Sequence, residues 1–154
     1  MKGNEKLLAT LNHLLGDELT AISQYMVHSE MCDNWGYDKL HKAIESQAKD
    51  EMHHAEWLIK RILFLEGAPV VSKLNPMKIG QTVRDIVSND QASEVEAVRV
   101  YNEAISLAHE VTDQATVDLL IQILKMEEGH VDWAEMQQTQ IEQMGIENYL
   151  ANQS

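Results

Sequence analysis

The stretch DEMHHAEW at Asp50–Trp57 returns as MEEGHVDW at Met126–Trp133, so the pattern E-x-x-H-x-x-W occurs twice in the chain. A glutamate and a histidine three residues apart project from the same face of an α-helix. The repeat also extends upstream, giving the full pattern E-x6-Y-x25-E-x2-H-x2-W. Its first copy is Glu18, Tyr25, Glu51, His54 and Trp57, and its second, 76 positions later, is Glu94, Tyr101, Glu127, His130 and Trp133.

The two copies together offer four carboxylates and two imidazoles. In each copy the first glutamate lies 33 residues before the second, far enough for one helix to end and the next to return. Helix bundles that hold two iron or manganese ions use this ligand set, with one glutamate from each of two helices and an E-x-x-H motif from each of the other two. The sequence therefore predicts a dinuclear metal site between four helices, with the ligands Glu18, Glu51, His54, Glu94, Glu127 and His130.

The remaining sequence predicts an all-α fold in one domain over residues 1–154. Pro69 and Pro76 are the only prolines, and apolar residues outside their segment recur at intervals of three and four. We expect helices over about residues 5–33, 38–66, 82–110 and 113–144, and a short fifth helix over about 146–152. Residues 67–81 are too many for a loop between adjacent antiparallel helices. We therefore expect a four-helix bundle in which this long connection leaves the third helix parallel to the second.

The ends of these helices carry recognisable signals. The last helix is too short to persist alone, so its Ile146, Tyr149 and Leu150 are expected to bury only against other subunits. The candidate N-caps are Asp38, Thr82 paired with Asp85, and Thr112 or Asp113, and Gly67 is the expected stop of the second helix.

All four glutamates occupy positions on the predicted helix seams that are otherwise filled by leucine, isoleucine and valine. Four buried carboxylates without cationic partners would be very unfavourable. A salt-bridge network is excluded as the partner because no lysine or arginine lies on these seams, and two imidazoles cannot neutralise four anions. Oxygen and nitrogen ligands suit iron or manganese, and the set lacks the thiolates of a structural zinc site. Tyr25 and Tyr101 are expected to hydrogen-bond ligand carboxylates, and Trp57 and Trp133 to pack.

The bulk composition excludes several classes of function. The formal net charge of −13 argues against nucleic-acid binding, which needs a basic surface. Cys32 is the only cysteine, so no disulfide can form within the chain and a reducing compartment is expected. No apolar run has the length of a membrane span, and the N-terminus lacks the layout of a signal peptide. We expect a cytoplasmic protein that binds neither membrane nor nucleic acid.

The chain resembles the bacterioferritins, the haem-containing members of the ferritin-like superfamily. The resemblance spans nearly the whole chain, and its most specific stretches are DEM followed by HAE and the EEGH run. The stretches that carry it are MKGN, LNHLLGDELTAISQY, NWG, DEMHHAE, RILFLEG, EEGHVDW and MGIENYL.

The resemblance implies iron storage and detoxification in a shell of 24 identical subunits built of dimers. Each bundle would carry one ferroxidase centre formed by the six ligands named above, with Glu51 and Glu127 bridging the metals. Ferrous iron would be oxidised there by dioxygen or peroxide and stored as mineral inside the shell.

The resemblance also implies a haem site. The family's axial haem ligand corresponds to Met52, which is rotated by ~100° from Glu51 on a helix and so points out of the bundle interior. Met52 from each of two subunits would ligate one shared haem b, or a related iron porphyrin, which aids iron release. An electron-donating ferredoxin is the implied redox partner.

One feature of some family members is only partly present. Their further iron site on the inner wall of the shell uses a histidine and acids in the turn before the haem methionine. Here that turn reads Glu45, Ser46, Gln47 and Asp50, so part of that site is missing.

Two alternatives remain open from the residues alone. A ferritin-like di-iron oxidase or peroxidase acting on a substrate other than iron would need a substrate channel to the metals. The cysteine pairs of a rubredoxin-like module are absent, which argues against a rubrerythrin. A metal-free helical scaffold is the other alternative, and four carboxylates on the seams argue against it.

Overall fold

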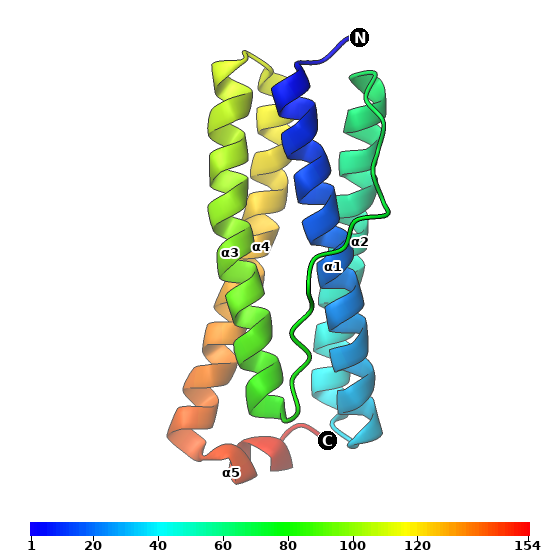
Figure 1. Ribbon diagram of the computed structural model, residues 1–154. Helices are drawn as coiled ribbons and strands as arrows, with labels where there is room; N and C mark the ends of the chain where they lie inside the picture. Colours follow the sequence, from blue (N-terminus) through cyan, green and yellow to red (C-terminus); the bar gives the residue numbers. More distant parts are fainter.

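The structure is a computed structural model that describes residues 1–154, and it consists of four long helices and one short one (Figure 1). No cis peptide bond is present. None of the helices has the length and apolar character needed to span a membrane. The helices are α1 (Glu5–Asn34), α2 (Asp38–Phe64), α3 (Val83–Glu110), α4 (Gln114–Met144) and α5 (Ile146–Ala151).

The four long helices form a bundle, and α5 lies across one end of it (Figure 1). Helices α1 and α2 pack as one antiparallel pair, and α3 and α4 as another. The connection between α2 and α3, residues 65–82, runs along the length of the bundle, so α3 is parallel to α2. The predicted fold class and the predicted crossover are therefore confirmed, and each helix boundary lies within two residues of its expected position.

The helix ends follow the predicted signals only in part. Thr82 and Asp113 do act as N-caps, accepting hydrogen bonds from the N–H groups of Asp85 at 3.2 Å and Thr116 at 3.1 Å. The prediction for Asp38 was wrong, because Asp38 is the first helical residue and α2 has no side-chain cap.

The predicted role of Gly67 also needs correction. The residue that leaves α2 with a positive φ, of 63°, is Glu66 rather than the glycine. Gly67 is instead closely packed, since a Cβ atom there would lie 2.7 Å from Cδ2 of Leu8 and would force that side chain to shift. The glycine signal therefore located the end of α2 to within one residue of the backbone turn.

The apolar core is divided into two clusters, one at each end of the bundle. The larger cluster joins the start of α1 and the end of α2 to the end of α3 and the start of α4, with Leu11, Leu58 and Leu120 fully buried. The smaller cluster includes Tyr25, Ile44 and Ile86 and reaches α5. A layer of buried polar side chains separates the two clusters.

Helix α5 belongs to its own subunit's core, which contradicts the expectation that it buries only against other subunits. Tyr149 is fully buried, and its hydroxyl donates to Oε1 of Gln137 at 2.6 Å. The backbone N–H of Lys39 donates to the carbonyl of Gln153 at 2.9 Å, which ties the chain end to the start of α2. Gly145, with φ of 80°, makes the turn that lets this short helix fold back onto the bundle.

Buried polar groups hold the crossover against the bundle. The N–H of Gly80 donates to Nε2 of His28 at 2.9 Å, so the other ring nitrogen of the neutral imidazole, Nδ1, carries the proton and donates to Asp90 at 2.8 Å. Gln24 donates to the same Asp90 oxygen at 2.9 Å and accepts from the N–H of Lys78 at 3.0 Å. These groups join α1, α3 and the crossover.

We expect Asp90→Ala to lower the free energy of unfolding by ~2–3 kcal/mol, because His28 and Gln24 would keep buried donors without an acceptor. Asn89→Ala is the matched control: its side chain bonds the same crossover from an exposed position, and its loss is expected to cost under ~1 kcal/mol. Urea unfolding measures both. Equal losses in the two variants would contradict the role of the buried network.

Candidate metal centre

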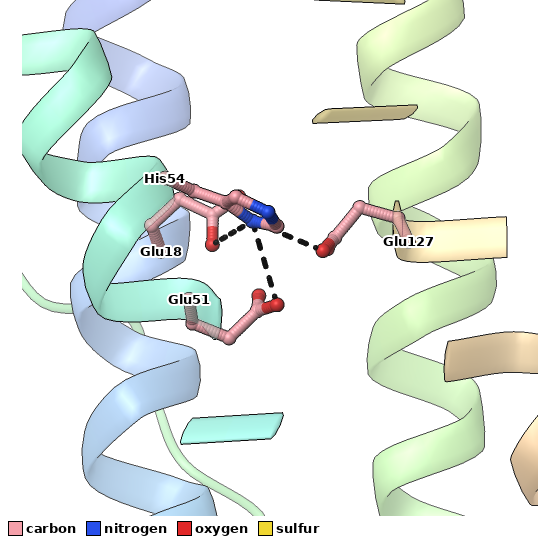
Figure 2. Close-up of side chains that lie close together, drawn as sticks. All are labelled: Glu18, Glu51, His54 and Glu127. Carbon is pink, nitrogen blue, oxygen red and sulfur yellow. Dashed lines mark ion pairs between the residues drawn. The ribbon is translucent and has the colours of Figure 1, made fainter. Parts of the chain in front are cut away.

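The six predicted ligands converge in the polar layer between the two apolar clusters. Figure 2 shows Glu18, Glu51, His54 and Glu127 pointing toward one another from α1, α2 and α4. Glu94 of α3 and His130 of α4 complete the set. All six residues are buried, none more than 7% exposed. Residues up to 112 positions apart in sequence, Glu18 and His130, therefore share one site.

The six residues form two overlapping groups with metal-binding geometry. In each group the candidate ligand atoms all lie within 4.8 Å of one another. Both groups contain Glu51 and Glu127, the two residues expected to bridge. The first group is Glu18, Glu51, His54 and Glu127, and the second is Glu51, Glu94, Glu127 and His130.

Each histidine presents Nδ1 to the carboxylates. His54 Nδ1 lies 3.2 Å from Glu127, 3.5 Å from Glu51 and 3.6 Å from Glu18. His130 Nδ1 lies 3.2 Å from Glu51, 3.3 Å from Glu94 and 3.6 Å from Glu127. The two imidazoles thus approach the shared glutamates from opposite halves of the repeat.

The two repeated tyrosines form hydrogen bonds with Glu18 and Glu94, the terminal glutamates, which each belong to only one of the two groups. The bonds run crosswise between the two halves of the repeat. Tyr25 of α1 donates to Glu94 of α3 at 2.5 Å, and Tyr101 of α3 donates to Glu18 of α1 at 2.6 Å. Their predicted role as hydrogen-bond partners of these carboxylates is confirmed, and the partner in each case belongs to the other half of the repeat. In Glu18 the oxygen that Tyr101 leaves free, Oε2, faces His54, whereas in Glu94 the oxygen that Tyr25 bonds, Oε1, also faces His130 and Oε2 has no partner.

Several buried polar atoms of the site have no hydrogen-bond partner within the protein. Native proteins pair almost all buried polar groups, and an unpaired one normally has a functional reason. Here the unpaired atoms belong to five of the six converging residues, so they mark one shared space. They are Glu18 Oε2, Glu51 Oε1, His54 Nδ1, Glu94 Oε2 and Glu127 Oε1.

Burial and mutual repulsion change the pKa values of these groups in the metal-free protein. Burial raises the pKa of Glu51 well above its ordinary value, and the negative charges of Glu18, Glu94 and Glu127 raise it further. Burial likewise raises the pKa of Glu94 to about 8, although its bond with His130 opposes the rise. The protein without metal therefore retains protons where cations would otherwise balance the charge.

The pKa values of the two histidines are also raised. Burial by itself lowers the pKa of an imidazole, but the nearby carboxylates of Glu127 and Glu18 outweigh it and raise the pKa of His54 to about 10. Bonds to Glu94 outweigh burial in the same way and raise the pKa of His130 to about 9. A cation at the centre would displace these protons.

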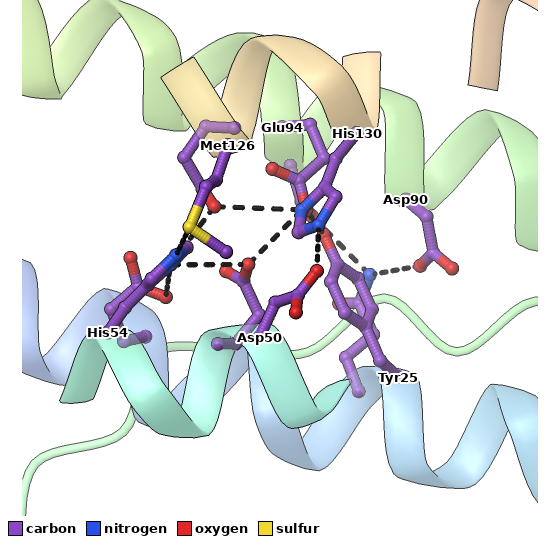
Figure 3. A network of polar contacts seen from close by, with 12 residues as sticks. Tyr25, Asp50, His54, Asp90, Glu94, Met126 and His130 are labelled. Atoms are coloured by element: carbon purple, nitrogen blue, oxygen red, sulfur yellow. Dashed lines mark hydrogen bonds and ion pairs between the residues drawn. The ribbon is translucent and has the colours of Figure 1, made fainter. Parts of the chain in front are cut away.

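Two further residues touch the centre and were not predicted as part of it. Figure 3 shows Met126 beside the ring of His54 and Asp50 beside the ring of His130. Asp50 Oδ2 lies 2.9 Å from His130 Nε2, and Met126 Sδ lies 3.2 Å from His54 Nε2. Both residues directly precede a shared glutamate, and the 76-residue repeat pairs them, which is the signal that could have found them.

A cavity of about 390 Å³ connects the surface to the centre between α1, α3 and the crossover. Glu18, Glu94 and Glu127 line it on the inside. Its outer part is lined mainly by polar side chains, among them His13, Asp17, Asn75, Lys78, Ser93 and Glu96. The centre is therefore accessible to a small polar solute.

Met52 and the two repeated tryptophans lie outside the centre. Met52 is 44% exposed on α2, so it points away from the bundle interior as expected. Trp57 packs beside His54 with ring centroids 5.6 Å apart, and Trp133 packs against the smaller apolar cluster. Both tryptophans therefore have the packing role that the sequence predicted.

Comparison with known proteins adds an independent line of evidence. A family model described as a ferritin-like domain matches residues 8–144. The chain is 41% identical over 154 residues to a protein named bacterial ferritin from Synechocystis sp., with 99% of each covered. It is 41% identical over 151 residues to a bacterioferritin from Mycolicibacterium paratuberculosis, covering 98% of this chain and 95% of the relative. A bacterioferritin from Rhodobacter capsulatus is 40% identical over 149 residues, covering 97% and 92%.

The metal-free protein is expected to lose stability as the pH rises from about 6 to about 9. The folded pKa values of Glu94, His54 and His130 lie above their ordinary values, so their protonation favours the folded state. That contribution is complete below the unfolded pKa values and is lost as the pH rises toward the folded ones.

Calorimetry of chelator-treated protein across this range measures the effect. The same protein loaded with Co²⁺ is the control, and it is expected to gain stability with rising pH, because ligands must be deprotonated to bind metal. An unfolding midpoint that stays constant or rises in the metal-free protein would contradict the assignment of the raised pKa values.

Proposed function

Because this chain belongs to the bacterioferritin family, we propose that it stores iron and that its buried centre is a ferroxidase site. The observation that carries the proposal is the set of five unpaired buried atoms directed into one space by four helices. Two divalent cations would satisfy these atoms and neutralise four carboxylates. The proposed ligands are Glu18, Glu51, His54, Glu94, Glu127 and His130, with Glu51 and Glu127 shared between the two cations.

In the proposed reaction, ferrous iron is the substrate and dioxygen the oxidant. Two ferrous ions each give up one electron, and O₂ takes both electrons and two protons to become hydrogen peroxide. Hydrogen peroxide could serve as oxidant in turn, taking two electrons and two protons to give two molecules of water. Holding the two ions side by side lets both electrons transfer together, so that no one-electron oxygen radical is released.

The side chains of the site suit this task. Carboxylates change between terminal and bridging coordination as iron becomes ferric, and Glu51 and Glu127 lie where each can reach both positions. Tyr25 and Tyr101 hold the terminal carboxylates in place through short hydrogen bonds. The site thus combines two adaptable ligands with two fixed ones.

The cavity favours iron over an organic substrate. An oxidase acting on an organic molecule would need an apolar pocket with a few polar groups. Here acids and amides are among the lining residues, with Asp17 and Glu96 on the outer part. His13 and Lys78 also line it, and Glu96 is paired with Arg99. Negative groups along a passage raise the local concentration of cations. The route therefore fits a hydrated ferrous ion.

The surface around Met52 fits a haem shared between two subunits. Glu30 of α1 and Glu45 of α2 approach each other on one side of the α1–α2 pair. Met26 and Met52 lie on that same side, because they are four and seven residues from these glutamates, and both are about half exposed. An exposed thioether can ligate a porphyrin iron, which would supply electron transfer across the shell when bound.

The proposed assembly is the shell of 24 identical subunits built of dimers, with mineral inside. The two-fold contact would bury the Met52 face and let each subunit give one axial ligand to the haem. A ferredoxin is the proposed electron donor for iron release, and the cytoplasm the proposed location.

Replacing Glu127 with Ala should leave a folded protein but abolish the fast phase of ferrous oxidation, slowing it by at least ~100-fold. The reason is that Glu127 belongs to both metal groups, so its loss removes the paired chemistry rather than weakening one position. Glu51→Ala should behave alike. Stopped-flow spectroscopy with two ferrous ions per subunit measures the rate.

Glu128→Ala is the matched control, since Glu128 is the next residue of α4 and its side chain is exposed. It should oxidise iron at the rate of the unmodified protein. An undiminished fast phase in Glu127→Ala would show that the centre is not the ferroxidase site.

Replacing Met52 with Leu should remove the haem and its Soret band, while ferrous oxidation stays fast and reductive iron release slows. Leucine keeps the volume and apolar character, so the stability cost should stay below ~1.5 kcal/mol. Met136→Leu, at an exposed methionine of α4, is the control and should keep its haem. A normal haem content in Met52→Leu would show that Met52 is only an interface residue.

A further inference from the structure

The internal repeat places two chemically different residues at equivalent positions beside the centre. Asp50 precedes Glu51, and 76 positions later Met126 precedes Glu127. The other members of the repeat are identical in type, namely the glutamates, tyrosines, histidines and tryptophans. The centre is therefore nearly symmetric in composition, and the pair of Asp50 and Met126 breaks that symmetry.

Each of these two residues contacts the histidine of the other half (Figure 3). Asp50 of α2 lies 2.9 Å from Nε2 of His130, and Met126 of α4 lies 3.2 Å from Nε2 of His54. In both histidines Nδ1 faces the carboxylates, as the distances of 3.2 to 3.6 Å show. Nδ1 is thus the nitrogen available to a metal, and Nε2 is the nitrogen that Asp50 or Met126 influences.

The two contacts differ in strength and in charge. An ionised carboxylate accepts a strong hydrogen bond from Nε2–H, fixes the proton there and makes Nδ1 a better donor to a metal. A thioether is neutral and a weak acceptor, so it orients the ring without raising its basicity to the same degree. The contact with Asp50 therefore strengthens His130 as a ligand more than the contact with Met126 strengthens His54.

The surroundings reduce the difference between the effects of Asp50 and Met126 on the two imidazoles without removing it. The Asp50 side chain is 35% exposed, so solvent screens part of the charge that acts on His130. The side chain of His54, in the other position, is fully buried. The crosswise tyrosine bonds have counterparts in both halves, whereas Trp57 packs beside His54 alone and Nδ1 of His130 lies within hydrogen-bonding distance of Glu94. The contrast between a carboxylate and a thioether is the difference in charge between the two Nε2 contacts.

We propose that Asp50 and Met126 are positioning residues that make the two metal positions unequal, so that the position at Glu94 and His130 binds a divalent cation first and more tightly. This inference rests on the proposed dinuclear site. It implies an order of loading in which the first cation arrives beside His130 and the second completes the pair beside His54. Loss of such a contact to a ligand histidine typically changes metal affinity by ~10–100-fold, and partial exposure of Asp50 suggests the lower end.

The test is titration of the metal-free assembled protein with Co²⁺, which reports binding through its visible absorption without iron oxidation. The expected result is two binding steps whose affinities differ by ~10-fold. Anomalous diffraction from crystals soaked with one Co²⁺ per chain should show the higher occupancy beside His130.

The variants separate the contributions of the two residues. Met126→Asp should bring the affinities of the two positions for Co²⁺ within about threefold of each other. The double variant that carries both Asp50→Met and Met126→Asp should move the higher Co²⁺ occupancy to the His54 position. Asp50→Asn, which keeps the size but removes the charge, gives the same information if the exchange does not fold, and should reduce the difference. Asp132→Asn, at an exposed acid of the same helix as Met126, is the control and should change nothing.

The outcomes distinguish this inference from the proposed function. Equal occupancy of both positions in the unmodified protein, or an unchanged difference in Met126→Asp and Asp50→Asn, would overturn the inference while leaving the dinuclear site intact. Absence of Co²⁺ from the space between the four helices would overturn the proposed function itself.

Discussion

The structure depends on the burial of four carboxylates in the middle of a helix bundle. Glu18, Glu51, Glu94 and Glu127 are each at most 2% exposed, and only two imidazoles share their layer. An unneutralised carboxylate in such a place is very unfavourable, so the fold requires protons or metal cations at its centre. The same layer divides the apolar core into two clusters, which means that packing at each end must stabilise the bundle around a polar middle.

The internal repeat explains how this centre is held. Each half supplies one terminal glutamate, one shared glutamate and one histidine, but the supporting contacts cross between halves. Tyr25 bonds Glu94, Tyr101 bonds Glu18, and Asp50 bonds His130. Neither helix pair could form the site alone, because each lacks the partners that fix its own ligands. Crosswise bonding thus makes the geometry of the centre a property of the whole bundle, and it leaves one position, Met126, where the two halves differ.

Polar contacts also decide how the ends and the long connection are held. His28, Gln24 and Asp90 hold the crossover from inside the bundle, and the same crossover forms one wall of the cavity that reaches the centre. At one end of the bundle, Tyr149 places α5 on the smaller apolar cluster. The passage to the buried centre and the end of the core beside α5 are therefore both shaped by segments that connect or follow the four main helices.

The sequence by itself determined the helices, the crossover and the six residues of the centre, because helical periodicity and a repeat of fixed spacing are local patterns in the chain. It was wrong about Tyr149, whose burial depends on Gln137 and on α1, neither of which is local to α5. It also did not place Asp50 and Met126, since the direction of a side chain across a bundle depends on how the helices are rotated against each other. Those rotations, the crosswise partners and the cavity were decided only by tertiary packing, which brings together groups that no spacing along one helix relates.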